Sequence, residues 1–201
     1  TGLGIYSLTV ILGLAIMIFL VYPVLIKRFA KVDFNTFLKA ISPAQLLAFS
    51  TSSSAATLPL TMERVEEKLG VSKKVSSFVL PLGATINMVG TLIGLLLLSL
   101  YTMKSFGIEV SLGDMTIVGF QSMIFATAAA GTPSASVVLL QDILVSQGVS
   151  AEYATYVTGI IITIDTLILD RLRTMLNTQS DSMSTANGLK IYHKKPKILM
   201  K

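Results

Sequence analysis

Hydrophobic residues form three long runs separated by shorter segments of mixed character. Residues 2–26 carry no charged side chain, and basic residues follow at once, beginning with Lys27. A run of this length crosses about 30 Å of hydrocarbon as an α-helix. The pattern predicts an all-α integral membrane protein with three spanning helices, at residues 1–30, 75–104 and 152–188.

Two segments between these runs have arms too short to cross a bilayer. Residues 33–70 place a small polar tip (50–59) between two short helical arms, and residues 114–148 repeat this plan around a tip at 130–135. Both are predicted to be re-entrant helical hairpins, which are tolerated at membrane depth only where their backbone is buried in protein or lines a cavity. A serine-rich loop in water is the alternative for the first tip.

The second spanning run is interrupted by Gly, Asn and Thr between positions 83 and 91. Such residues in mid-membrane predict a discontinuous helix with unwound carbonyls, and a continuous kinked helix is the alternative. Together the two hairpins and their neighbouring spans indicate an internal repeat. In secondary transporters, interrupted segments at corresponding positions mark the binding site.

The distribution of charge explains why the chain is basic. Charged residues make up 13%, about half the usual soluble share, which argues against a soluble α/β protein with a buried core. Of the 16 Lys and Arg residues, 13 fall within 27–74 and 190–201. The positive-inside rule therefore predicts a multi-pass protein of the cell membrane with a basic cytoplasmic tail at 189–201. Anionic lipid, not nucleic acid, accounts for the positive charge.

The last spanning helix carries ionisable residues, which are expensive inside a membrane and are candidates for function. At 100° per residue, Thr174, Asn177 and Asp181 lie within about 40° of Asp170, with Arg173 about 60° to one side. Asp170 suits an ammonium group and Arg173 a carboxylate, while Asn177 and Asp181 offer oxygen ligands for a cation. An ion-pair network that only joins helices is the alternative.

Other features narrow the class of function. Arg171, about 100° from Asp170, fits a snorkelling anchor. The tips at 52–54 and 132–134 offer backbone N–H groups and helix N-termini, which attract anions. We find no nucleophile–base pair, phosphate-binding loop or histidine cluster, and Cys is absent, so the sequence predicts no enzyme, disulfide or thiolate metal site.

Four motifs carry a resemblance to a known family. They are Ser52-Ser53-Ser54-Ala55-Ala56-Thr57-Leu58-Pro59, Leu80-Pro81-Leu82-Gly83-Ala84-Thr85-Ile86-Asn87-Met88, Gly131-Thr132-Pro133 and Asp170-Arg171-Leu172-Arg173-Thr174, followed by Asn177 and Asp181. In order and spacing the chain resembles the C-terminal transport-domain half of the dicarboxylate/amino acid:cation symporters. That family includes the excitatory amino acid transporters and their archaeal homologues.

The resemblance implies sodium-coupled symport of L-aspartate or L-glutamate by an elevator mechanism, with the hairpins at 33–70 and 114–148 as inner and outer gates. By similarity, Asp170 takes the amino group of the substrate and Arg173 its side-chain carboxylate. The implied substrate contacts are Ser53, Ser54, Thr91, Thr132, Asp170, Arg173, Thr174 and Asn177.

The resemblance also implies two sodium sites. The first would use Asp181 with the carbonyls of Gly83, Asn87 and Asn177. The second would use the carbonyls of Thr85 and Met88, with hairpin carbonyls near Ala126, Thr127 and Ala129.

The chain departs from the family pattern in four ways. Val89 replaces an aspartate of a third sodium site, which we therefore expect to be missing. The Glu or Gln that the family uses as a proton carrier is replaced near Leu95, so the expected proton carrier is missing. The family carries an aspartate four residues before Asp170, whereas Asp165 is five before, about 140° away in an α-helix. The trimerisation scaffold that precedes the transport domain is absent from this sequence.

Two alternatives remain open, and these departures favour only the second of them. One is a carrier of C4-dicarboxylates or neutral amino acids, although an unpaired buried Arg173 disfavours a neutral substrate and Asp170 disfavours one without an amine. The other is a truncated, degenerate or engineered transport domain that binds weakly or not at all. The expected partners are the acidic amino acid, membrane lipid, and a scaffold chain or homotrimer.

Overall fold

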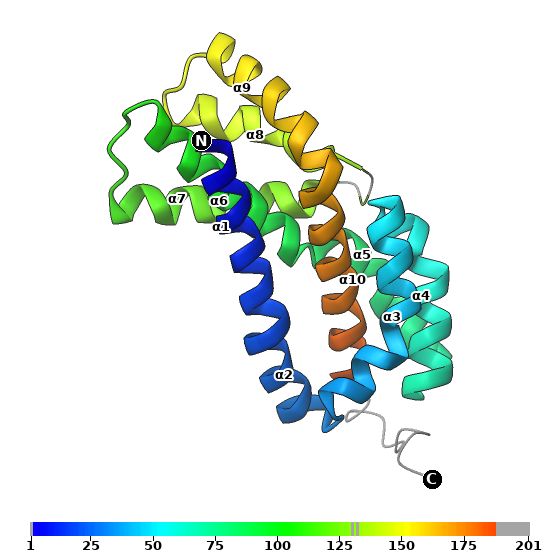
Figure 1. Ribbon diagram of the computed structural model, residues 1–201. Helices are drawn as coiled ribbons and strands as arrows, with labels where there is room; N and C mark the ends of the chain where they lie inside the picture. Colours follow the sequence, from blue (N-terminus) through cyan, green and yellow to red (C-terminus); the bar gives the residue numbers. More distant parts are fainter. Residues whose placement is uncertain (1, 130, 132, 188–201) are drawn as a thin grey trace.

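The computed structural model describes residues 2–129, 131 and 133–187 (Figure 1). Within these ranges every regular element is a helix, which confirms the predicted all-α membrane fold. Three helices are long and apolar enough to cross a membrane: Gly4–Ala30, Lys73–Ser105 and Ala151–Asn187. They coincide with the three predicted spans. The predicted tail at 189–201 lies outside the described residues.

The first span is one continuous rod of α- and π-helical segments. One face is buried through Tyr6, Val10 and Leu14, which are four residues apart, as a helix requires for side chains on one face. Leu12 and Phe19 point outward and are exposed. The rod therefore packs on the protein through one stripe and presents an apolar surface elsewhere. Its segments are α1 (Gly2–Ile16), η1 (Met17–Val21), α2 (Tyr22–Leu25) and η2 (Ile26–Ala30).

Two capped helices, α3 (Phe34–Thr51) and α4 (Ser54–Leu69), form the first hairpin. The Asp33 side chain accepts a hydrogen bond from the first turn of α3, and Ser53 does the same for α4. Between them Ser52 adopts a left-handed conformation (φ 51°), which reverses the chain direction. Polar caps at the start of each helix thus satisfy part of its terminal backbone N–H groups.

The second span is broken in the middle, as the sequence predicted. α5 (Lys73–Ile86) and α6 (Val89–Ser105) are separated by Asn87 and Met88, whose ψ angles of 52° and 55° are not helical. The break replaces helical hydrogen bonds by contacts to the last helix, described below.

The second hairpin and the last span complete the chain. α7 (Leu112–Ala128) begins with a capping box in which Ser111 and Asp114 bond each other's backbone N–H, and α8 (Ala135–Ser146) returns from its tip. The last span consists of α9 (Ala151–Ile164), η3 (Asp165–Leu169) and α10 (Asp170–Asn187). Thr132, in the second tip, lies outside the described residues.

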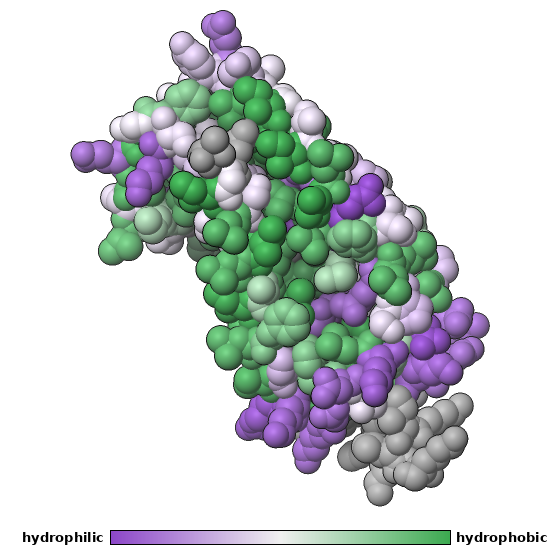
Figure 2. Space-filling model, in the orientation of Figure 1, coloured by the Kyte–Doolittle hydropathy of each residue, from purple (hydrophilic) through white to green (hydrophobic). Residues whose placement is uncertain are grey.

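The most polar helix of the chain, α10, lies at its centre. It packs against α3, α4, α5 and α6, and most of its side chains are buried. Figure 2 shows apolar side chains over the middle of the visible face and hydrophilic ones gathered at its lower end. Lys27, Arg28 and Lys31, which follow the first span, are exposed. The fold therefore has an apolar exterior around a polar interior, the arrangement expected in lipid.

Two glycines let α6 approach α10 closely. A Cβ at Gly90 would lie 2.5 Å from the Arg173 carbonyl oxygen, and one at Gly94 would lie 2.5 Å from Arg173 Cδ and Nη1. Real Cβ atoms do not come this close, so a larger residue requires a shift of the α10 backbone opposite Gly90, or of the buried Arg173 side chain opposite Gly94. Small residues at such spacing are typical of tightly packed membrane helices.

We expect Gly90→Ala to lower the free energy of unfolding by about 1–3 kcal/mol, because the methyl group meets backbone that has no room to move. Thermal unfolding in detergent measures this effect. The matched control is Gly119→Ala on α7, where an added Cβ meets nothing within 4 Å. That control should be neutral or stabilised by up to about 1 kcal/mol. Equal melting of the two variants would contradict the close contact.

Candidate functional site

One face of α10 collects the polar residues that the sequence singled out. Asp170, Arg173, Thr174, Asn177 and Asp181 are all buried, with exposed fractions of 1–6%. The helical spacing therefore places them together, as predicted. Each group is withdrawn from water and needs a polar partner within the protein.

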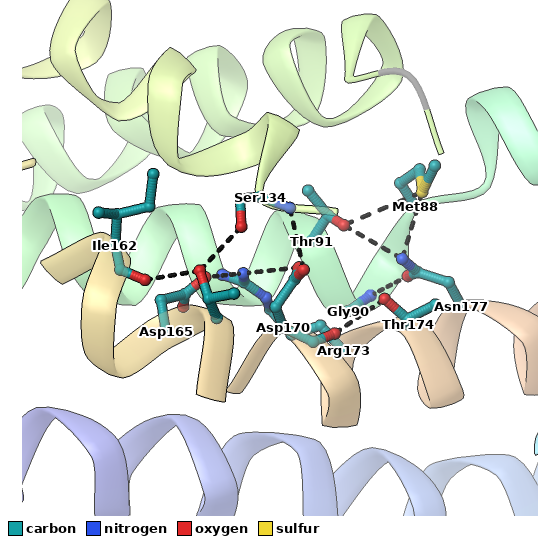
Figure 3. Close-up of polar contacts among 11 residues, drawn as sticks. Met88, Gly90, Thr91, Ser134, Ile162, Asp165, Asp170, Arg173, Thr174 and Asn177 are labelled. Carbon is teal, nitrogen blue, oxygen red and sulfur yellow. Dashed lines mark hydrogen bonds and ion pairs between the residues drawn. The ribbon is translucent and has the colours of Figure 1, made fainter. Parts of the chain in front are cut away.

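Arg173, the one cation of this face, is 1% exposed. Its Nη2 lies 2.5 Å from Asp165 Oδ2 and 3.1 Å from Asp170 Oδ1 (Figure 3). Two carboxylates thus neutralise one guanidinium, which offsets the cost of burying it. Asp165 is completely buried and belongs to this cluster. The 140° offset expected of an α-helix was wrong here, because residues 165–169 form a π-helical turn.

Asn177 fastens α10 to the break in the second span. Its Oδ1 accepts from the Gly90 N–H at 2.7 Å, and its Nδ2 donates to Thr91 Oγ1 at 3.1 Å and Met88 Sδ at 3.2 Å. The amide therefore serves a backbone group exposed by the interruption. Thr174 is internally satisfied, since its hydroxyl donates to the Asp170 carbonyl at 2.8 Å.

A second polar cluster lies one turn further along α10. Asn87 Nδ2 donates to Asp181 Oδ1 at 3.0 Å, and the Ser180 hydroxyl donates to Asn87 Oδ1 at 3.2 Å. A Cβ at Gly83 would lie only 2.6 Å from Asp181 Oδ1, so the carboxylate lies directly against the backbone there. A pocket of about 160 Å³ opens beside Gly83, Asn87 and Asp181.

Most residues expected to hold sodium lie near the C-terminal ends of α5 and α7, whereas Asn177 and Asp181 lie within α10. Gly83, Asn87 and Asp181 of the first predicted set are adjacent, and Asn177 lies one turn away on α10. In the second set, Thr85 and Met88 lie at the C-terminal end of α5. The other three members, Ala126, Thr127 and Ala129, lie at the C-terminal end of α7, and α7 packs against α5. Helix C-termini carry free carbonyls and partial negative charge, which suits a monovalent cation.

Within the described residues there is no group of three or more Asp, Glu, His or Cys side chains suited to a metal. Asp181 is 4% exposed, and its hydrogen-bond partner is the Asn87 amide. A carboxylate supported by carbonyls fits sodium better than a divalent transition metal. The donor set is therefore compatible with the predicted ion.

The tips of the two hairpins touch. Ser53 Oγ donates to the Gly131 carbonyl at 2.7 Å, and the Ala55 N–H approaches the same oxygen at 3.3 Å. Ser54, also a predicted substrate contact, is 5% exposed beside them. Segments 78 residues apart in sequence thus meet through one carbonyl.

Ser134 joins the second tip to α10 and η3. It has a left-handed backbone (φ 59°), its N–H donates to Asp170 Oδ2 at 3.0 Å, and its hydroxyl lies 2.8 Å from Thr166 Oγ1. Figure 3 shows Ser134 above Asp170, on the side away from Asn177. Asp170 therefore contacts both the second hairpin and Arg173. The predicted contact Thr132 lies outside the described residues.

Arg171 binds the first hairpin rather than extending to the membrane surface. Its Nη1 donates to the carbonyls of Phe49 (3.0 Å) and Ser50 (2.8 Å), at the C-terminal end of α3. The snorkelling alternative is therefore wrong, because the side chain caps a neighbouring helix. Such a contact depends on tertiary structure, and helical periodicity carries no signal of it.

The sequence did not single out Thr166 or Gly94, it placed Asp165 off the face, and it named Ser134 only as part of a tip that offers N–H groups. Asp165 and Thr166 reach it only through the π turn. Ser134 reaches it through the fold of the tip. The glycine spacing at 90 and 94, together with a buried arginine, was the one sequence signal for the close contact between α6 and α10.

Comparison with known proteins supports the family resemblance that the sequence motifs indicated. Residues 1–187 match the sodium:dicarboxylate symporter family. The chain is 40% identical to mouse excitatory amino acid transporter 3 over 91% of its length and 34% of the relative's. It is 38% identical to rat excitatory amino acid transporter 4 (92% and 32%) and 36% identical to human excitatory amino acid transporter 1 (90% and 32%).

The chain thus spans about a third of the length of these relatives. The family is one of transporters, which agrees with the prediction that the protein is not an enzyme. The polar helix, the broken span and the matched length lead to one conclusion: this chain belongs to the sodium:dicarboxylate symporter family.

Proposed function

We propose that this chain is the substrate-binding part of a sodium-coupled symporter for acidic amino acids, aspartate or glutamate. The observation that carries the proposal is the buried guanidinium of Arg173 held beside Asp170 on a membrane-spanning helix. An ammonium and a carboxylate on one ligand match these two groups. The relatives are named excitatory amino acid transporters, which supports the same substrate class.

In this proposal Asp170 binds the amino group and Arg173 the side-chain carboxylate. The hairpin tips supply N–H groups for the α-carboxylate, since helix N-termini favour anions. The remaining proposed contacts are Ser53, Ser54, Thr91, Thr132, Thr174 and Asn177.

Formal charge gives a reason for sodium coupling. Asp165, Asp170 and Asp181 against Arg173 amount to three negative charges and one positive, a formal charge of −2 in a buried space. An acidic amino acid adds a further −1. In a low-dielectric site this is costly without cations. Two sodium ions, one at Asp181 and one between the ends of α5 and α7, would offset two of these three negative charges.

A third sodium site is not part of the proposal. Val89 stands where the family pattern has an aspartate, at the first position of α6. Leu95, at the place of the expected proton carrier, is completely buried and apolar. These replacements support coupling to two sodium ions.

The two hairpins would act as gates on either side of the substrate. The hydrogen bond between Ser53 and Gly131 would couple the positions of the two tips. Because Ser134 donates to Asp170, substrate at Asp170 would alter how the second tip is held. Carriage across the membrane would be an elevator movement of this whole domain against a scaffold supplied by another part of the protein, a partner chain or a homotrimer. The C-terminus would be cytoplasmic.

A carrier of neutral amino acids is the second candidate, and one contact favours it. Arg173 is paired with Asp165 and Asp170 without any ligand, so a neutral substrate would not leave the guanidinium unpaired. The guanidinium therefore disfavours a neutral substrate less than the sequence alone indicated. A C4-dicarboxylate, which lacks an amine, would leave Asp170 unmatched.

Equilibrium binding of L-aspartate to the detergent-purified chain tests the function. We expect saturable binding in sodium chloride and at least about 30-fold weaker binding in choline chloride, because cations offset the buried negative charge. Binding of L-alanine but not L-aspartate would support the neutral carrier. Absence of binding of either amino acid would overturn an autonomous site and leave a domain that needs a partner or has lost function.

Replacing Arg173 by Ala should weaken L-aspartate binding at least about 100-fold, since truncation of a buried charge partner costs about 2–5 kcal/mol. Isothermal titration measures the change. Lys104→Ala, at the end of α6, removes a cation outside the site and should bind as wild type does. Unchanged binding by the Arg173 variant would refute its role as the carboxylate ligand.

Asp181→Asn should shift the sodium dependence of binding to higher concentration by at least about tenfold, because it removes the one carboxylate of the proposed first site. The readout is L-aspartate affinity at a series of sodium concentrations and constant ionic strength. Asp142→Asn, an exposed change of the same kind on α8, is the control. An identical sodium response in both variants would remove Asp181 from the ion site.

A further inference from the structure

The last span contains a single five-residue π turn, η3, placed immediately before Asp170. Its hydrogen bond joins the Asp170 N–H to the Asp165 carbonyl, five residues back. In an α-helix Asp165 would lie about 140° from Asp170. The wider π turn returns it to the same face, and such turns occur frequently at functional sites.

The π turn directs its polar residues inward and its apolar residues outward. Asp165 is completely buried against Arg173, and the next residue, Thr166, contacts Ser134 of the second tip. By contrast Leu167 and Ile168 are 65% and 55% exposed. Both inward contacts depend on the π turn, because a plain α-helix with the same number of residues would rotate Asp165 and Thr166 by about 100° relative to Asp170.

The contacts of Arg173 show what Asp165 does. Both carboxylates approach Nη2, and Asp165 is the nearer. Arg173 Nε and Nη1 are buried without a hydrogen-bond partner. If the amino group of a substrate takes Asp170, Asp165 is the anion left to hold the guanidinium. Asp165 binds only Nη2, so the Nε and Nη1 donors of Arg173 remain free for a ligand.

We propose that Asp165 is a positioning residue for Arg173, and that the π turn is a register correction that brings it there. Asp165 lies five residues before Asp170, one more than an α-helix needs to place both on one face. The π turn accommodates the additional residue and returns Asp165 to that face. The part of the proposal that concerns substrate rests on Arg173 being the carboxylate ligand. The part that concerns register stands on the geometry alone.

Deletion of Ile168 tests the register. It shortens the spacing from Asp165 to Asp170 to four residues, so a plain α-helix places both on one face. We expect this variant to melt within a few degrees of the wild type. Deletion of Ile160, in the regular helix α9, has no π turn to absorb it and rotates buried Ala154 away from α8, so it should melt markedly lower. Equal damage by the two deletions would overturn the register correction.

A double-mutant comparison without any ligand tests the pairing. Arg173→Gln leaves Asp165 as an uncompensated buried anion and should lower the melting temperature strongly. Adding Asp165→Asn removes that anion, so the double variant should melt above Arg173→Gln alone. The same result is expected when Ile168 is deleted. A double variant that melts at or below the single one would overturn the pairing, whatever the substrate is.

Discrimination between L-aspartate and L-asparagine tests positioning against a merely structural role. The two ligands differ in the carboxylate that Arg173 would bind. A structural lesion weakens both equally, whereas a displaced guanidinium loses the difference. We expect Asp165→Asn to reduce the ratio of the two dissociation constants at least about tenfold and Asp165→Glu to restore part of it. An unchanged or larger ratio would overturn positioning. If the wild type binds neither ligand, the proposed function fails, while the melting comparisons still decide the register.

Discussion

A positive charge buried at membrane depth is the constraint on which the rest of this structure depends. Arg173 is sealed from solvent, so its charge must be compensated by fixed groups of the protein. Asp165 and Asp170 supply that compensation at 2.5 and 3.1 Å. Each irregularity nearby serves the same end: glycines at 90 and 94 make room for the side chain, and the π turn brings the second carboxylate.

The same polar interior explains why the second span is broken and the hairpins are held at their tips. A broken helix leaves backbone groups without partners, and in lipid they must be satisfied by protein. Asn177 and Asp181 on α10 reach the break, Arg171 caps α3, and Asp170 holds Ser134. One helix therefore fastens three separate elements. This linkage gives a ligand at Asp170 a physical route to the second tip, because the carboxylate that would bind an amine already bonds that tip.

Periodicity and hydropathy were sufficient for the spans, the break and the shared face of α10, since these follow from local spacing. They failed where a residue reaches its partner through an irregular backbone. An α-helix at 100° per residue puts Asp165 off the face, and nothing in the sequence of residues 165–169 marks the π turn. Arg171 was assigned to the membrane surface for a related reason: its partners are carbonyls of a helix more than 120 residues away. Contacts between distant segments leave no periodic signal.

Internal compensation of Arg173 changes how selectivity is to be understood. An unpaired guanidinium would demand an acidic ligand, whereas this one is satisfied by the protein and an acidic ligand has to compete for it. The competition is favourable only if the amino group releases Asp170 and cations offset the added negative charge. Preference for an acidic substrate would then be a property of the ligand and its ions together. Selectivity and coupling would thus share one electrostatic cause, and a change in the counter-charge would alter both.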